Sequence, residues 1–223
     1  MTGDKLAVQV LSVRLIANAM PGLCHAYGFP DTVRSVGLIS TDCDDATYIA
    51  LDEATKKANV EVIYGRSLYA GAANASTRLA GEVIGMLGGE NPSEVRSGLY
   101  AALDSLKHIG FRTANDAGDI VYLAHSIART GTYLSRLAHI PQGQPLAYLI
   151  APPLEATVGL DAALKSADVT LKELFAPPSE TNFAGGLLTG TESACRTACE
   201  AFAQTIKAVA EQPIHIGGSY GIR

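Results

Sequence analysis

The first half of the chain combines short apolar runs with one long helical pattern. Apolar runs of strand length predict four strands, at residues 6–17, 33–40, 60–68 and 81–87. Between the second and third runs, apolar residues recur at steps of three and four from residue 44 to residue 59, which predicts a helix. Asp44 or Asp45 is predicted to be its N-cap, because a short acidic side chain accepts hydrogen bonds from the first N–H groups of a helix.

A second helix has a clear start signal. Asn91 is its predicted N-cap, Pro92 its first residue and Glu94 the acidic residue of its first turn, and Gly110 is predicted to end it. The second half then repeats this order of strand-like and helical patterns. These patterns cover residues 119–138, 145–151, 156–167, 169–175, 185–188 and 191–207. Strands and helices mixed in this way predict an α+β fold.

An internal repeat connects the two halves. Residues 50–60 align without a gap to residues 159–169, and six of the eleven positions are identical, including Leu51 with Leu160 and Asp52 with Asp161. Such a match indicates a duplicated folding unit. We therefore expect two tandem domains, residues 1–110 and 111–223, related by a pseudo-twofold axis.

The composition points to a chain that associates with copies of itself. Residues are 48% hydrophobic but only 17% charged, below the usual ~25%. Small residues dominate at positions where the surface of a monomer would carry Lys and Glu. We therefore expect part of the surface to be covered in an assembly. The net charge of −5 gives no reason to expect nucleic acid or an anionic membrane as a partner. No apolar stretch reaches ~18 residues, and the chain is expected to be soluble and cytoplasmic.

The four cysteines and five histidines suggest neither a metal site nor a nucleophile. Cys195 and Cys199 lie four residues apart without a nearby His or carboxylate, so we interpret them as small buried apolar residues. The histidines are scattered. The glycine pairs at residues 88–89 and 185–186 lack the Lys, Ser or Thr of a phosphate loop, and no cofactor is expected.

The repeated helix and the strand after it resemble the signature helix of the bacterial microcompartment (BMC) shell domain. Longer stretches resemble the tandem, circularly permuted branch of that family found in ethanolamine-utilisation microcompartments. They cover residues 37–50, 64–72, 149–157 and 177–183. The resemblance implies two permuted BMC domains, each a ferredoxin-like α/β sandwich. It also implies a non-enzymatic shell protein whose homotrimer forms a pseudohexameric tile among other shell proteins, with pores for small metabolites.

The acidic run at residues 42–45 is the sharpest local feature. Asp42, Asp44 and Asp45 have the oxygen ligands that a divalent cation prefers, which leaves a metal-dependent enzyme open as an alternative. The other interpretation is the end of a strand followed by a helix start, where carboxylates favour the helix dipole.

The resemblance adds a third role for Asp44, in an ethanolamine site inside a cleft between the two halves. The positions that match the family's site are Asp44, Tyr69, Glu82, Phe111, Thr181 and Asn182. Carboxylates suit the ammonium of ethanolamine, aromatic rings suit its carbon chain, and Asn182 suits its hydroxyl. Two simpler interpretations stay open. Glu82 is then merely exposed to solvent, and Tyr69 and Phe111 merely pack within the fold, without a ligand. A soluble amine-binding sensor that never assembles is a further alternative.

Overall fold

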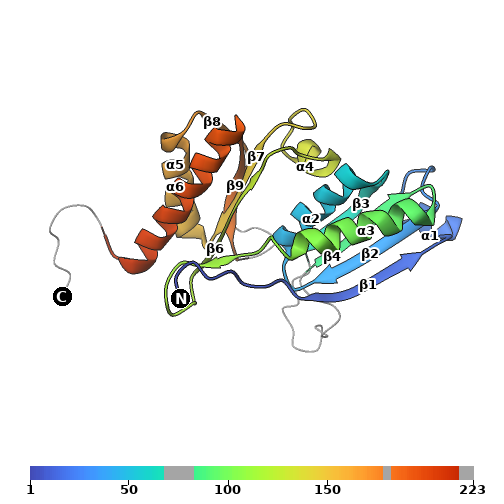
Figure 1. Ribbon diagram of the computed structural model, residues 1–223, viewed down its shortest axis with the longest axis horizontal. Helices are drawn as coiled ribbons and strands as arrows, with labels where there is room; N and C mark the ends of the chain where they lie inside the picture. Colours follow the sequence, from blue (N-terminus) through green and yellow to red (C-terminus); the bar gives the residue numbers. More distant parts are fainter. Residues whose placement is uncertain (68–82, 178–181, 216–223) are drawn as a thin grey trace.

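The computed structural model has two antiparallel sheets, each with its own helices (Figure 1). It describes residues 1–67, 83–177 and 182–215. The first half comprises β1 (Val10–Ile16), α1 (Pro21–Tyr27), β2 (Ser35–Thr41), α2 (Asp44–Lys57), β3 (Glu61–Ser67), β4 (Val83–Gly89) and α3 (Pro92–Leu106). The second comprises β5 (Arg112–Thr113), β6 (Val121–Ile127), α4 (Thr132–Leu137), β7 (Leu146–Ala151), α5 (Pro153–Ser166), β8 (Val169–Phe175), β9 (Ala184–Gly190) and α6 (Glu192–Glu211).

The second sheet repeats the topology of the first. The first sheet has the strand order β1-β2-β4-β3, and the second has β5-β6-β7-β9-β8. Apart from the two-residue strand β5, each strand of one sheet has a counterpart in the other, and α1, α2 and α3 correspond in chain order to α4, α5 and α6. This arrangement confirms the predicted α+β fold with two tandem units.

The core is shared between the halves. α2 and α3 cover one face of the first sheet, and α5 and α6 cover one face of the second (Figure 1). Along β7, Ala147 and Leu149 face α5 and α6, whereas Tyr148 and Ile150 belong to the buried cluster around α2. α2 therefore packs on the first sheet and also contacts β7 of the second, where Tyr148 is hydrogen-bonded to Asp45. A domain boundary between residues 110 and 111 stays a prediction.

Several predicted helix ends need correction. The cap of α3 is confirmed, since the Asn91 side chain accepts a hydrogen bond from the Glu94 N–H at 3.0 Å, but the helix ends at Leu106 rather than at Gly110. A Cβ at Gly110 would lie 2.5 Å from the Leu6 carbonyl oxygen, so this glycine permits a close approach of two backbones. The N-cap of α2 is Cys43, and both candidate aspartates lie inside the first turn.

The N-terminal segment departs from the expected strand. β1 begins at Val10, because the chain before it runs along the second half instead: the Leu6 N–H donates to the Phe111 carbonyl, and Gly3 donates to Thr113, both at 2.8 Å. The short elements α1 and β5 were not predicted. Cys195 and Cys199 are buried as expected, and burial raises the pKa of Cys199 to about 12. Among the described helices, none is both long and apolar enough to cross a membrane.

Candidate ligand site between the two halves

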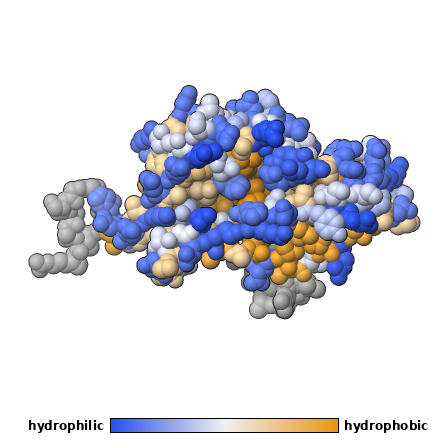
Figure 2. All heavy atoms as spheres, viewed as in Figure 1, coloured by the Kyte–Doolittle hydropathy of each residue, from blue (hydrophilic) through white to orange (hydrophobic). Residues whose placement is uncertain are grey.

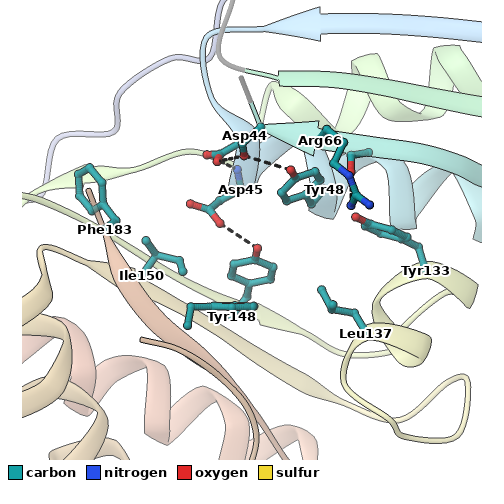
Figure 3. A pocket seen from close by; sticks show the side chains of 12 residues that line it. Asp44, Asp45, Tyr48, Arg66, Tyr133, Leu137, Tyr148, Ile150 and Phe183 are labelled. Carbon is teal, nitrogen blue, oxygen red and sulfur yellow. Dashed lines mark hydrogen bonds between the residues drawn. The ribbon is translucent and has the colours of Figure 1, made fainter. Parts of the chain in front are cut away.

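A cavity of about 300 Å³ lies between α2 and β3 of the first half and α4, β7 and β8 of the second (Figure 3). This volume is at the lower end of the range for small-molecule pockets. Its wall is formed by Asp44, Asp45, Tyr48, Gly65, Arg66, Ser67, Tyr133, Leu137, Tyr148, Ile150, Phe175 and Phe183. Two adjacent carboxyl groups and five aromatic rings therefore surround one small space.

Asp44 is held in place by the start of α2 and by β3. One of its carboxylate oxygens accepts a hydrogen bond from the Asp45 N–H at 2.8 Å, and the other accepts from the Ser67 hydroxyl. The Ser67 oxygen is also hydrogen-bonded to the Tyr48 hydroxyl at 3.1 Å. A carboxylate has about four acceptor positions. Asp44 therefore keeps acceptor capacity for a donor that enters the cavity.

Asp45 is buried one residue further along α2. Its carboxyl accepts a hydrogen bond from the hydroxyl of Tyr148 on β7 at 2.8 Å (Figure 3). Burial, with a smaller contribution from the nearby Asp44 charge, raises the pKa of Asp45 to about 8, although the Tyr148 hydrogen bond acts in the opposite direction. Burial also raises the pKa of Tyr148 well above its ordinary value. At neutral pH the Asp45 carboxyl is thus largely protonated.

Four of the five aromatic rings of the wall lie in two pairs. The ring centres of Tyr48 and Tyr133 are 6.1 Å apart, and those of Tyr148 and Phe175 are 6.2 Å apart. Arg66 also lines the cavity, and its guanidinium lies 5.8 Å from the centre of the Tyr64 ring, on its own strand. An aromatic surface beside a carboxylate suits a small organic cation, because both groups attract an ammonium.

Only part of the predicted ligand site can be placed. Asp44 lines the cavity. Phe111 lies behind the wall, with its ring 5.4 Å from that of Phe183, and Asn182 is an exposed neighbour of Phe183. The other three predicted residues, Tyr69, Glu82 and Thr181, lie outside the described residues. The complete six-residue site stays a prediction.

The acidic run does not form one cluster. Asp42 accepts a hydrogen bond from the Gln9 N–H at 2.8 Å and is not part of the cavity wall. Within the described ranges, no group of three or more His, Cys, Asp or Glu side chains is arranged to hold a metal ion. The described residues therefore give no support to the metal-dependent enzyme.

Sequence reasoning missed the partner residues of the second half. Tyr148 was interpreted only as part of a strand, and Asp45 as part of a helix start or of a metal-binding cluster. They are 103 positions apart in the chain, so no local pattern connects them. The strand pattern could have indicated this pair, because it places the Tyr148 hydroxyl on a buried face of the sheet. A buried hydroxyl needs a hydrogen-bond partner.

Two permuted sheets of the same topology, with a ligand-sized cavity between them, define a tandem BMC-domain protein. The family model for the BMC domain matches residues 35–115. The bacterial microcompartment shell protein EutL of Clostridium perfringens is 56% identical over 215 residues, which cover 96% of this chain and 99% of that protein. The chain therefore belongs to the EutL family of bacterial microcompartment shell proteins.

Solved structures agree with this assignment. The crystal structure of ethanolamine utilization protein EutL from Leptotrichia buccalis is 58% identical and has a TM-score of 0.93, with 96% of this chain and 100% of that chain covered. The crystal structure of EtuB from Clostridium kluyveri is 23% identical, with a TM-score of 0.73 over 90% of this chain and 88% of that one. At that identity the likeness shows a shared fold alone.

Proposed function

We propose that the chain is a structural, non-enzymatic component of the shell of an ethanolamine-utilisation microcompartment in the cytoplasm, where it contacts other shell proteins. The observation that carries this proposal is the identity of 56% to a protein named as a EutL shell protein, over nearly the whole of both chains. The low charged fraction of 17% agrees with a protein whose edges are covered by neighbours.

The assembly unit is a homotrimer that forms a pseudohexameric disc. Each chain supplies two units of the same topology, so three chains supply the six units of a ring. Mass photometry and sedimentation at micromolar concentration test this. The expected particle has the mass of three chains of 23.3 kDa. A stable monomer would remove the basis for a tile, and a monomer that still binds an amine would be the soluble sensor instead.

The cavity between the halves binds ethanolamine. Its ammonium is held by Asp44, and its two carbons lie against the aromatic wall that includes Tyr48 and Phe183. By resemblance to the family, Tyr69, Glu82, Phe111, Thr181 and Asn182 complete the site. The support is that Asp44, chosen from the sequence, lines a cavity whose size and chemistry suit a small organic cation.

Calorimetric titration tests the ligand. We expect heat of binding with ethanolamine and none with ethylene glycol at the same millimolar concentration, because the diol has no charge for Asp44 to pair with. Equal binding of the two compounds, or no heat with either, would contradict ethanolamine binding in this cavity. It would not affect the proposed role as a shell tile.

Pores in the disc would let small metabolites cross the shell. A ligand in the cavity between the halves can favour one state of such a pore only as far as it binds the two states with different affinity. Flux of a small metabolite through reconstituted shells, measured with and without ethanolamine, tests this coupling, and equal flux in both conditions would exclude it.

A further inference from the structure

Asp45 is a buried carboxyl in the wall of the cavity between the two halves, and a charge on it would be poorly compensated. It is 9% exposed, and the Tyr148 hydroxyl donates a hydrogen bond to one of its oxygens at 2.8 Å. Among the described residues, no Lys, Arg or His forms an ion pair with it. A single neutral donor compensates a buried negative charge only in part, because the charge loses its hydration on burial.

Asp52, about two turns further along α2, provides the contrast. It is fully buried, and its carboxylate accepts hydrogen bonds from the backbone N–H groups of Gly131 at 2.7 Å and Leu134 at 2.8 Å. The Lys56 ammonium lies 3.9 Å from the same carboxylate. Asp52 is thus a compensated carboxylate that joins α2 to α4, whereas Asp45 has no cationic partner among the described residues.

The surroundings of Asp45 favour its protonated form. Figure 2 shows apolar atoms where the two halves meet, and Ile150 and Phe175 line the same cavity. Asp44, the neighbour of Asp45 in the first turn of α2, adds a second carboxyl to the wall. Burial, and to a smaller extent the Asp44 charge, raise the pKa of Asp45 to about 8. Without a ligand, the cavity therefore holds the Asp45 proton at neutral pH.

Other titratable groups face this part of the cavity from each element around it. They are Cys43, Asp44 and Tyr48 of α2, Arg66 of β3, Tyr133 of α4 and Tyr148 of β7. Burial raises the pKa of Cys43 to about 12 and that of Tyr148 well above its ordinary value, so both keep their protons at neutral pH. β8 contributes Phe175, which does not titrate. Asp45 is the group whose pKa the fold moves into the neutral range.

A cation in the cavity would reverse this balance. Asp44 and Asp45 line one space of about 300 Å³, and the Asp44 charge already acts on Asp45. A positive charge within about 4–6 Å lowers the pKa of a carboxyl by about 1–3, which takes that of Asp45 from about 8 to about 5–7. A primary ammonium has three N–H donors, so one can point to Asp44 and another to Asp45. The Tyr148 hydroxyl already donates to Asp45 and continues to do so in the ionised form.

We propose that Asp45 is a second ligand-binding carboxyl of this cavity, and that an entering primary ammonium displaces its proton. The ammonium replaces the proton as the positive partner of the carboxyl, the proton passes to the solvent, and the O–H bond of Asp45 is the one bond broken. Close to one proton is therefore released for each amine that binds. The inference rests on the ethanolamine binding proposed above and adds to it a carboxyl and a dependence on pH.

The sign of this dependence follows from linkage. Below about pH 5, Asp45 keeps its proton with and without the ligand, so the association constant does not change with pH. Between the pKa of the occupied cavity and about pH 8, binding releases a proton, and the association constant rises by up to tenfold per pH unit. Above about pH 8, Asp45 is ionised before the ligand arrives, and the rise ends.

Calorimetry of the full-length protein with ethanolamine tests the proton release. The titration is made at about pH 7 in phosphate and in HEPES, two buffers that differ in ionisation enthalpy and contain no primary amine. The difference in heat between the buffers gives the number of protons released, and we expect close to one per ethanolamine. Equal heat in both buffers would overturn the role of Asp45 and leave ethanolamine binding intact. No heat with ethanolamine in either buffer would overturn the proposed ligand site, and this inference with it.

Variants assign the proton to Asp45. Asp45→Asn keeps an oxygen that accepts from Tyr148, and it is expected to bind ethanolamine without proton release and with an affinity that is constant between about pH 6 and pH 8. Asp42→Asn is the matched control, because Asp42 accepts from the Gln9 N–H outside the cavity wall, and it should release as many protons as the wild type. Undiminished proton release by Asp45→Asn would assign the proton to another group, such as Glu82, and overturn the proposal.

A third variant serves if circular dichroism shows that Asp45→Asn is unfolded. Tyr148→Phe removes the hydrogen bond that lowers the pKa of Asp45. The pH at which the association constant stops rising should therefore move above that of the wild type. An unchanged pH would show that Asp45 does not supply the proton.

Discussion

The hydroxyl of Tyr148 on β7 donates a hydrogen bond to the carboxyl of Asp45 on α2, so that a buried polar pair joins the two halves of the chain. Because burial raises the pKa of Asp45 to about 8, the folded protein holds a proton that the unfolded chain releases near the ordinary pKa of 3.8. The resulting stabilisation is complete below the ordinary pKa and is lost as the pH rises toward 8.

We therefore expect the free energy of unfolding of the wild type to fall between about pH 5 and about pH 8, relative to that of Asp45→Asn. The amide of the variant does not titrate, so the difference isolates this one carboxyl. Urea unfolding of both proteins at one protein concentration measures it. A difference that stays constant across this pH range would show that Asp45 is ionised in the fold.

Asp52→Ala is expected to lower the free energy of unfolding by about 2–5 kcal/mol, since it leaves the N–H groups of Gly131 and Leu134 buried without acceptors. Asp104→Ala is the matched control, because Asp104 forms an exposed pair with Lys107 at 2.9 Å and its loss should change stability by less than ~1 kcal/mol. Chemical unfolding measures both variants, and equal stability of the two would contradict this role of Asp52.

Much of the fold could be predicted from local patterns. The alternating β8 strand was predicted with its observed ends, and the cap of α3 followed from Asn91 and Pro92. α1 was missed because it has seven residues, none of them buried, so it shows no apolar period. The error at the start of α2 arose because Asp44 and Asp45 point toward the cavity rather than capping the helix.

The site was less accessible to sequence reasoning. Asp44, which lines the cavity, was proposed because a motif around it resembles a known family. Tyr148 and Phe183 were not assigned to the site, because they reach the cavity only through the packing of the second half against α2. The hydrophobic periodicity of a single helix or strand carries no information on such contacts between residues far apart in the chain.

Ethanolamine is expected to bind once per chain rather than once per BMC unit. In the second half, the positions of Asp44 and Asp45 are taken by Pro153 and Leu154, so the repeated unit has no acidic counterpart of the site. Calorimetry should give one site per chain. Asp44→Ala should weaken binding by about 1.5–3 kcal/mol, the usual contribution of a hydrogen bond to a charged group.

Asp42→Ala is the control for that titration, because it removes a carboxylate of the same acidic run that contacts Gln9 instead of the cavity. It should bind ethanolamine with wild-type affinity. Two sites per chain, or equal affinity of Asp44→Ala and Asp42→Ala, would show that the ligand binds elsewhere.

The fragment of residues 1–110 is expected not to fold alone. The cluster around α2 includes Leu134, Tyr148 and Leu187 of the second half, and these would be missing from the fragment. Its buried Asp52 would also lose both backbone donors. Circular dichroism during heating measures this, and a cooperative transition of the isolated fragment would show instead that the predicted domain boundary separates two independent cores.

Electron microscopy of the purified full-length protein tests most directly whether the chain is a shell tile. The account predicts flat sheets in which discs pack in a hexagonal lattice, each disc with the mass of three chains. Dispersed single chains that form neither discs nor sheets, at concentrations where the protein is folded, would contradict it.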